Sequence, residues 1–302
     1  MMVRDIFRTD PAFPINPAQF ERAYPITDIE SFLRWWSFIH PIEGTLEYFY
    51  PILGRHIEHL KAQKVLYSEL MIAAGELPRD EIEALEKLGA FRNWVDEKEA
   101  GDIQVEFLVA IGRNKSPEDV EKLAGLVLTL YNSGLIVGVA LSGPEEGNPV
   151  RTFHRTFARF HEAGLGIEVH AGEWCGKESI WDALEYGYPN RIGHGVSLFQ
   201  DPRLITIFQE RQIHIELCVT SNLKTGSISD IKEHPIRRAR ELGLNFSINT
   251  DDPGPFECSM ESEYALVEEV FEFGEGDFRK VYHNSLASRF QPHLRINSTS
   301  WV

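Results

Sequence analysis

The stretch Val169-His170-Ala171-Gly172-Glu173 decides how the rest of the chain is interpreted. The largely apolar residues 166–169 before it predict a buried strand, and helical sequence begins near residue 178. An imidazole and a carboxylate therefore follow a strand, at its C-terminal end, where β/α barrels carry their catalytic residues. His170 is suited to ligate a metal ion there, and Glu173 to reach a water held by that ion. The alternative is that both are ordinary polar residues at a strand end.

The same order of strand and helix continues on both sides of this stretch. Strands are predicted at 64–70, 103–110, 136–141, 166–169, 191–195, 213–219 and 246–249, with helices between them and a last helix at 259–273. Such alternation is typical of parallel βαβ units. An open doubly wound sheet usually has a glycine-rich phosphate turn after its first strand, and no such turn follows the first strand here. We predict an α/β fold, a (β/α)8 barrel of the TIM type, with one strand missing from the count.

The length of 302 residues allows one large barrel or two smaller domains. The continuous alternation favours a single barrel domain over residues 1–302. Residues 1–62 precede the first predicted strand, and their prolines predict a loop to about residue 26. A capping box at 27–30 then predicts one helix, and apolar spacing predicts another at about 43–62.

The composition restricts the partners and the compartment. The net charge of -16 argues against nucleic acid and against an anionic membrane surface, and fits a small neutral or cationic molecule better. The three cysteines are scattered and form no CxxC pair, so neither a disulfide framework nor a thiolate zinc site is expected. The start of the chain lacks a signal-peptide pattern, and no apolar run has membrane-spanning length. We expect a cytoplasmic protein; the sequence does not indicate its oligomeric state.

Two further predicted strands are also followed or ended by polar residues that could take part in catalysis. His194 lies between two glycines at the end of one strand, and the pair Asp251-Asp252 follows the last strand. Parallel strands of a barrel point one way, so these residues should meet His170 and Glu173 on one face. Imidazoles and carboxylates around one cavity fit metal-assisted hydrolysis. Taken singly, His194 could instead be a satisfied histidine in a tight turn, and the aspartates a helix cap.

The segments at 170–173, 191–195, 216–222, 247–253 and 284–288 resemble the signature segments of the adenosine deaminase family. The resemblance extends from about residue 27 to residue 290. Members of this family are zinc-dependent (β/α) barrels that hydrolyse the 6-amino group of purines. The resemblance therefore implies a purine aminohydrolase that binds one zinc ion and a small-molecule purine or purine nucleoside.

The resemblance also implies roles for single residues. His170 and Asp251 would ligate zinc, and Asp251 would also hold the attacking hydroxide. Glu173 would protonate a ring nitrogen of the purine, while His194 would orient and polarise the hydroxide.

Two further residues would bind the substrate. The resemblance implies that the backbone amide of Gly143 and the side chain of Asp252 would hydrogen-bond the purine.

One departure from the family concerns the metal. Family members begin with a strand that carries His-x-His, both histidines being zinc ligands, and no such segment precedes the first predicted strand here. The first strand of the family is therefore the one missing from the count, and the sequence does not tell whether the chain is truncated or mis-started. Two family ligands remain, whereas a catalytic zinc normally keeps three. Zinc should then bind weakly or not at all, and deamination by this chain should be poor.

Three functions follow from these observations. The first is deamination of adenosine to inosine and ammonia. The second is deamination of adenine or of a modified aminopurine. The third, from another class, is a non-catalytic relative that binds a purine or a partner protein.

Overall fold

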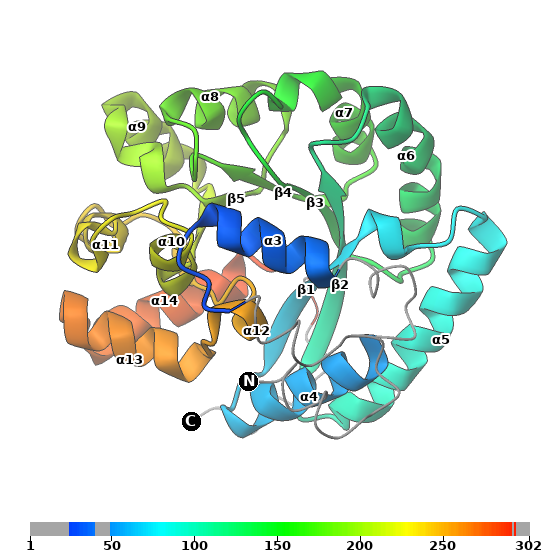
Figure 1. Ribbon diagram of the computed structural model, residues 1–302, viewed down its shortest axis with the longest axis horizontal. Coiled ribbons are helices and arrows are strands. Elements are labelled where there is room, and N and C mark those ends of the chain that lie inside the picture. The colour runs from blue at the N-terminus through cyan, green and yellow to red at the C-terminus, as the bar shows by residue number, and fades with distance from the viewer. Residues whose placement is uncertain (1–23, 40–48, 292, 294–302) are drawn as a thin grey trace.

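The computed structural model describes residues 24–39, 49–291 and 293. Within them, seven parallel strands form one sheet in which each strand pairs with the next along the chain. The strands are β1 (Tyr67–Ala73), β2 (Gln104–Gly112), β3 (Gly138–Ser142), β4 (Gly166–Ala171), β5 (Arg191–His194), β6 (His214–Leu217) and β7 (Phe246–Ile248). The sheet curls, and most of the helices lie along its outer side (Figure 1). The predicted barrel class is confirmed.

The helices along the chain lie where the sequence predicts them, except those at 219–224 and 253–256, where no helix was predicted. They are α5 (Glu81–Glu99), α6 (Pro117–Asn132), α7 (His154–Glu162), α8 (Lys177–Tyr186), α9 (Pro202–Arg211), α10 (Val219–Lys224), α11 (Ile236–Glu241), α12 (Pro253–Phe256) and α13 (Met260–Phe271), with 3-10 turns η3 (Ala74–Glu76), η4 (Val150–Phe153), η5 (Val196–Gln200) and η6 (Ile231–Glu233). Two predictions are wrong. Helix α14 (Glu275–Ala287) follows the helix predicted to be last, and β6 ends before residues 218–219, which belong to the start of α10.

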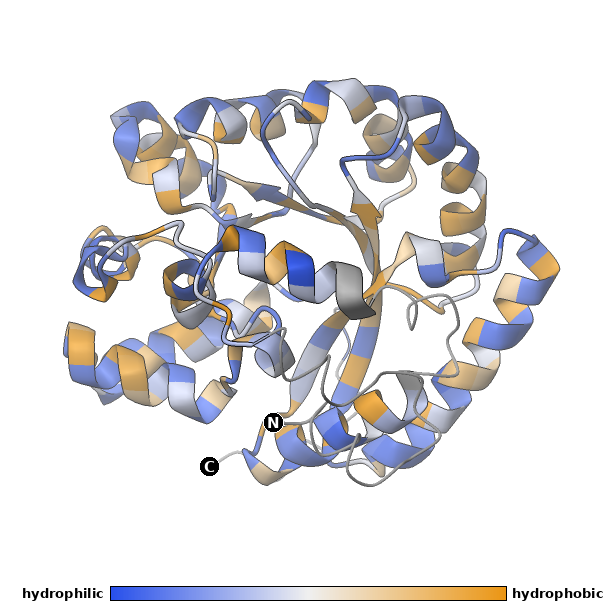
Figure 2. Cartoon of the chain, in the orientation of Figure 1, coloured by the Kyte–Doolittle hydropathy of each residue, from blue (hydrophilic) through white to orange (hydrophobic). Residues whose placement is uncertain are grey.

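The outer face of the sheet builds the main core. In β2, Val105, Phe107 and Val109 are almost fully buried in the cluster that the surrounding helices complete. Figure 2 shows apolar residues along the strands and polar residues on the outer sides of the helices. Strands of a parallel sheet are buried on both faces, and for this reason the sequence of β2 is an almost continuous run of apolar residues.

The inner side of the sheet is more polar. The Arg191 guanidinium forms ion pairs with Glu69 at 2.5 Å and with Glu216 at 3.0 Å, and it stacks on the Phe290 ring at 3.6 Å. The backbone N–H of Phe290 donates to Glu69 Oε1 at 2.7 Å. The segment after α14 is thereby held against β1 and β5.

The N-terminal loop and helices predicted for 1–62 are described in part: residues 1–23 and 40–48 lie outside the described residues. The predicted helices correspond to α3 (Ile29–Ile39) and α4 (Phe49–Ala62). The predicted capping box differs in detail, because the carboxylate of Asp28 accepts from the Ser31 N–H at 2.7 Å. Helix α3 crosses in front of the sheet in Figure 1, and its Phe32 stacks on Phe256 of α12 at 5.0 Å. None of the described helices is long and apolar enough to span a membrane.

His214 should make the fold acid-sensitive. The ring is buried at the start of β6, with Nδ1 2.9 Å from Asn245 Oδ1 and Nε2 2.8 Å from Ser247 Oγ. Burial lowers the pKa of His214 to about 4, from 6.5. The unfolded chain takes up a proton below pH 6.5 and the folded chain does so only near pH 4, so stability is full above pH 6.5 and falls between these values. At about 1.4 kcal/mol per unit, the loss is about 3 kcal/mol.

The variant His214→Gln keeps a hydrogen-bonding side chain and removes this titration. Urea unfolding at pH 7 and at pH 4.5 should show a smaller loss of stability in the variant than in the native chain. Equal losses in both proteins would exclude His214 as a source of acid sensitivity.

Candidate active site

The structure brings together the histidines and the glutamate predicted at the ends of two strands. His170 belongs to β4 and His194 ends β5, where Ala171 pairs with His194 in register. The two imidazole centroids are 4.7 Å apart. One ligand atom from each of His170, Glu173 and His194 lies within 4.8 Å of the others. Three predicted site residues therefore share one small volume.

Asp251 forms a second group with His194. Its carboxylate, the His194 ring and the Cys218 thiol each offer one atom within 4.8 Å of the others. The Ser221 hydroxyl donates to Asp251 Oδ2 at 2.7 Å and fixes that carboxylate. His194 belongs to both groups, whereas the two predicted metal ligands, His170 and Asp251, fall in different groups.

The two predicted purine-binding residues lie at the ends of strands as well. Gly143 directly follows β3, the strand that pairs with β4, and is exposed. Asp252 is half-buried and precedes α12, next to Asp251. Their positions are compatible with a substrate held at this edge, and their contacts with a purine stay predictions.

The backbone is bent at the residues that form the cluster. His194 and Asp251 have φ angles of 63° and 55°, a left-handed conformation that few residues other than glycine adopt. Gly172, between His170 and Glu173, has a φ of 72°, and a Cβ there would lie 2.4 Å from the Ser197 hydroxyl oxygen. Such backbone conformations often accompany functional sites, where they direct side chains that regular strands would not.

A buried carboxylate holds the turn that carries Glu173. Glu145 accepts from the backbone N–H groups of Gly172 and Glu173 at 2.8 Å each and of Trp174 at 2.9 Å. The Ser179 hydroxyl also donates to Glu145. Four donors on one carboxylate fix the turn, so the position of Glu173 depends on Glu145.

The environment changes the protonation of the cluster. Burial raises the pKa of Glu173 to about 7, although neighbouring His194 opposes this. Burial, with His194 and Arg113 nearby, lowers the pKa of His170 well below its usual range, so this imidazole is neutral. For His194, burial lowers the pKa, but Glu173 and Asp251 outweigh it and the net pKa is raised. A carboxyl group that titrates near pH 7 is suited to proton transfer.

A chain of hydrogen bonds sets the proton position on His194. The Ile236 N–H donates to His234 Nδ1 at 3.2 Å, so His234 carries its proton on Nε2, which lies 3.2 Å from Asn222 Oδ1. The Asn222 amide N–H then donates to His194 Nδ1 at 3.2 Å. The neutral His194 ring therefore keeps its proton on Nε2, 3.5 Å from Glu173 Oε2.

Several of these supporting residues were not predicted as site residues. Glu145 follows the predicted strand end at Gly143 by two residues, and Asn222 lies in a segment that carried the family resemblance without an assigned role. The sequence contained a signal for both. His234 and Arg113 had none, because their contacts with the cluster depend on how distant loops pack.

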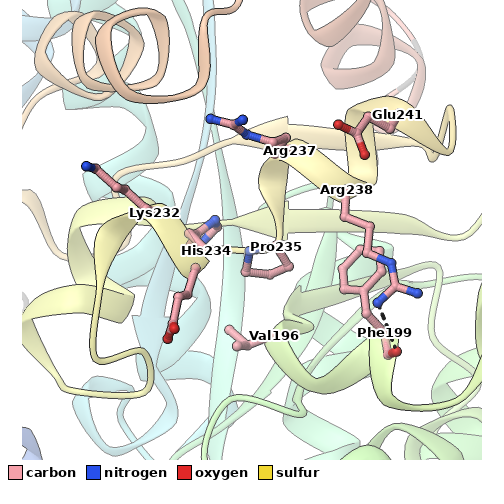
Figure 3. A pocket seen from close by; sticks show the side chains of 9 residues that line it. Val196, Phe199, Lys232, His234, Pro235, Arg237, Arg238 and Glu241 are labelled. Atoms are coloured by element: carbon pink, nitrogen blue, oxygen red, sulfur yellow. Dashed lines mark hydrogen bonds between the residues drawn. The ribbon is translucent and has the colours of Figure 1, made fainter.

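A hollow of about 410 Å³ opens beside this chain of hydrogen bonds (Figure 3). Its lining includes Val196, Phe199 and Arg238, whose guanidinium donates to the Phe199 carbonyl at 3.3 Å. Among its lining residues, His234 provides the hydrogen bond toward Asn222 and His194. His170, Glu173 and Asp251 do not line it.

Comparison with known families decides the class of protein. The family model described as adenosine deaminase matches residues 15–298. The chain belongs to the adenosine deaminase family. The predicted resemblance is thereby confirmed over most of the chain, and the chain is an aminopurine-deaminase relative with an amidohydrolase barrel.

Individual relatives agree with this family. An adenine deaminase of Rhizobium leguminosarum bv. trifolii is 30% identical over 269 residues, which are 89% of this chain and 83% of the relative. The solved adenine deaminase of Arthrobacter aurescens superposes with a TM-score of 0.82 at 24% identity, over 96% of this chain and 89% of that one. A solved amidohydrolase from Burkholderia ambifaria with bound Zn gives a TM-score of 0.82 at 18% identity, over 95% and 82%.

The donor set of the cluster fits a divalent metal ion of the kind that this family implies. A neutral imidazole is the form that ligates metal, and His170 is held neutral by burial. The Asp251 carboxylate supplies a negative oxygen, oriented by Ser221. Nitrogen and oxygen donors of these types are ordinary zinc ligands.

Proposed function

We propose that this chain hydrolyses the exocyclic amino group of an aminopurine and releases ammonia, with free adenine as the main substrate. The observation that carries the proposal is the buried Glu173, whose pKa lies at about 7, beside His170 and His194. Family membership supports the reaction class.

Glu173 would move the proton that the reaction needs. Replacement of the amino group requires a proton on the purine ring nitrogen, so that the ring can accept electrons from the incoming oxygen. A carboxyl group with a pKa near the working pH can give that proton and take it back. Glu145 and the turn at Gly172 would keep Glu173 in place during the transfer.

His194 would hold the attacking water. Because Asn222 donates to Nδ1, the ring presents Nε2–H toward Glu173. An N–H donor there can orient the oxygen nucleophile for attack on one face of the ring.

His170 and Asp251 would hold the metal ion. When bound, zinc supplies the Lewis acidity that lowers the pKa of water from about 16 to about 7. Asp251 would also accept a hydrogen bond from the attacking water.

The relatives favour adenine over adenosine as the substrate. The Rhizobium relative, matched over most of both chains, and the Arthrobacter structure are both named adenine deaminases. Gly143 and Asp252 would bind the purine edge, which adenine, adenosine and modified aminopurines share. The negative charge of the chain disfavours a phosphorylated substrate. The unpaired cysteines are compatible with a cytoplasmic location.

The test follows ammonia release by the zinc-supplemented chain with adenine, adenosine and AMP side by side. We expect the highest kcat/KM with adenine. A higher value with adenosine would favour the second candidate, and a preference for AMP would contradict the substrate proposal. Purine binding without ammonia from any substrate would indicate a non-catalytic relative.

A further inference from the structure

Helix α10 carries two of the side chains that orient the cluster. The Ser221 hydroxyl donates to Asp251 Oδ2 at 2.7 Å, and the Asn222 amide nitrogen lies 3.2 Å from His194 Nδ1. Both side chains are buried. The helix has six residues, and a helix this short has little stability of its own. Contacts with other parts of the fold must therefore fix its position.

The first turn of α10 has no side-chain cap from its own segment. The N-cap residue, Cys218, accepts no hydrogen bond there, so the backbone N–H groups of this turn need other acceptors. Glu263 of α13 provides one, because its Oε2 accepts from the Thr220 N–H at 3.1 Å. The two residues are 43 positions apart in the chain, so this bond ties α10 to a distant segment.

Glu263 is buried close to the cluster. Its side chain has no exposed surface, and α13 packs against both α10 and β7, the strand that precedes Asp251. Burial raises the pKa of Glu263 more than the hydrogen bonds from Thr220 and Val219 lower it. The charge of Asp251 adds to the rise. A carboxyl oxygen accepts an N–H in the neutral and in the charged form, so the cap does not require ionisation.

We propose that Glu263 is a positioning residue for the reaction and acts through α10. By holding the first turn of this helix, it fixes the position of Ser221 against Asp251. The same turn fixes the position of Asn222 against His194. The inference rests on the roles that the proposed function gives to Asp251 and His194. Glu145 fixes the turn that carries Glu173 in the same manner, by accepting from its backbone N–H groups.

The test replaces Glu263 with methionine, which keeps the length of the side chain and removes the acceptor. When the apo protein is titrated with zinc alone, affinity should fall by about tenfold or more, because residues that support metal ligands typically contribute roughly 10–100-fold. The kcat for ammonia release, measured at saturating zinc, should fall in the same range. KM should stay near native, because the predicted purine-binding residues Gly143 and Asp252 lie outside α10. Glu263→Gln retains an oxygen acceptor and should recover most of both losses.

Nitrogen NMR of the apo protein examines the second contact without metal or substrate. At a pH where the His194 ring is neutral, the native spectrum should show the ring proton on Nε2, since Asn222 donates to Nδ1. In Glu263→Met, the displaced Asn222 should allow a mixture of the two tautomers. Glu263→Gln should keep the native spectrum.

Glu99→Met is the matched control for lost stability. Glu99 is also buried and accepts from a backbone N–H, that of Val105 at 2.9 Å. It ends α5 ahead of β2, at the opposite edge of the sheet from the C-terminal strand ends. The variant should be less stable in thermal unfolding, yet keep native zinc affinity, kcat and His194 spectrum.

Three results would overturn the proposal. One is a folded Glu263→Met with native zinc affinity, kcat and His194 spectrum. The others are equal losses in Glu99→Met, which would make the effect one of stability, or in Glu263→Gln, which would make it one of charge. Glu263→Ala takes the place of Glu263→Met if the methionine variant does not fold. If the native chain releases no ammonia, the deamination proposal fails, and the NMR comparison still decides whether Glu263 positions α10.

Discussion

Replacing Glu173 with glutamine should lower turnover of the preferred aminopurine by at least about 10²-fold. General acid–base groups typically contribute 10²–10⁴-fold, and glutamine has no proton to transfer at the same position. The amide can still accept from Asn222, which lies 3.5 Å from Glu173 Oε1, so the local structure should persist. Steady-state ammonia release measures the effect, and zinc content should remain close to native because Glu173 is assigned no metal bond.

A surface glutamate provides the control for this variant. Glu146 is exposed and directly follows Glu145 in the loop after β3. Glu146→Gln changes the net charge equally and should leave turnover unchanged. A native rate in Glu173→Gln would remove this residue from the mechanism, whereas loss of zinc from Glu173→Gln would make it a ligand instead.

The strand ends of the site could be predicted because two independent regularities meet there. Alternating apolar and helical segments predict parallel βαβ units, and parallel strands bring their C-terminal ends to one edge. His170, His194 and Asp251 each follow such a segment, so their approach in space follows from topology alone. His170 and Asp251 each belong to a group that includes His194 and whose ligand atoms lie within 4.8 Å of one another, which agrees with that prediction.

Glu168 shows why the inner side of the sheet was harder to predict. The sequence around it, residues 166–169, predicts a buried strand, and the two-residue spacing puts Glu168 on the side of His170 without showing which groups surround it there. The surroundings of its carboxyl group are set by Gly193 of the neighbouring strand and by the charges of Arg191 and Asp251. These are contacts between residues far apart in the chain, which a local pattern does not encode.

Helix α14 and the segment after it were missed for a related reason. The N-cap residue of α14 is Gly274, which provides no side-chain cap, so the start of the helix carries only half of the usual capping signal, the Asp277 carboxylate that accepts from the Gly274 N–H. Phe290 looks like an ordinary aromatic residue near the end of the chain, yet its ring packs with Leu108 and Ala140 on the inner side of the sheet. Whether a terminal aromatic residue is buried is decided by the space that the strands leave.

Replacing Arg191 with methionine should destabilise the fold by about 3–5 kcal/mol, the usual cost of removing one partner from a buried ion pair. The guanidinium is 8% exposed and pairs with Glu69 and Glu216. Without it, two carboxylates would stay on the inner side of the sheet without compensation. Urea unfolding at pH 7 measures the loss.

Arg279→Met is the matched control, because that arginine is 69% exposed and its pair with the exposed Glu275, at 2.8 Å, should contribute about 1 kcal/mol or less. The cause can be separated from lost packing by adding Glu69→Gln and Glu216→Gln to Arg191→Met. If unpaired carboxylates cause the loss, the triple variant should regain part of the stability. If the triple variant is no more stable than Arg191→Met, the loss must come instead from the stacking of Arg191 on Phe290, and the ion pairs would have no measurable role.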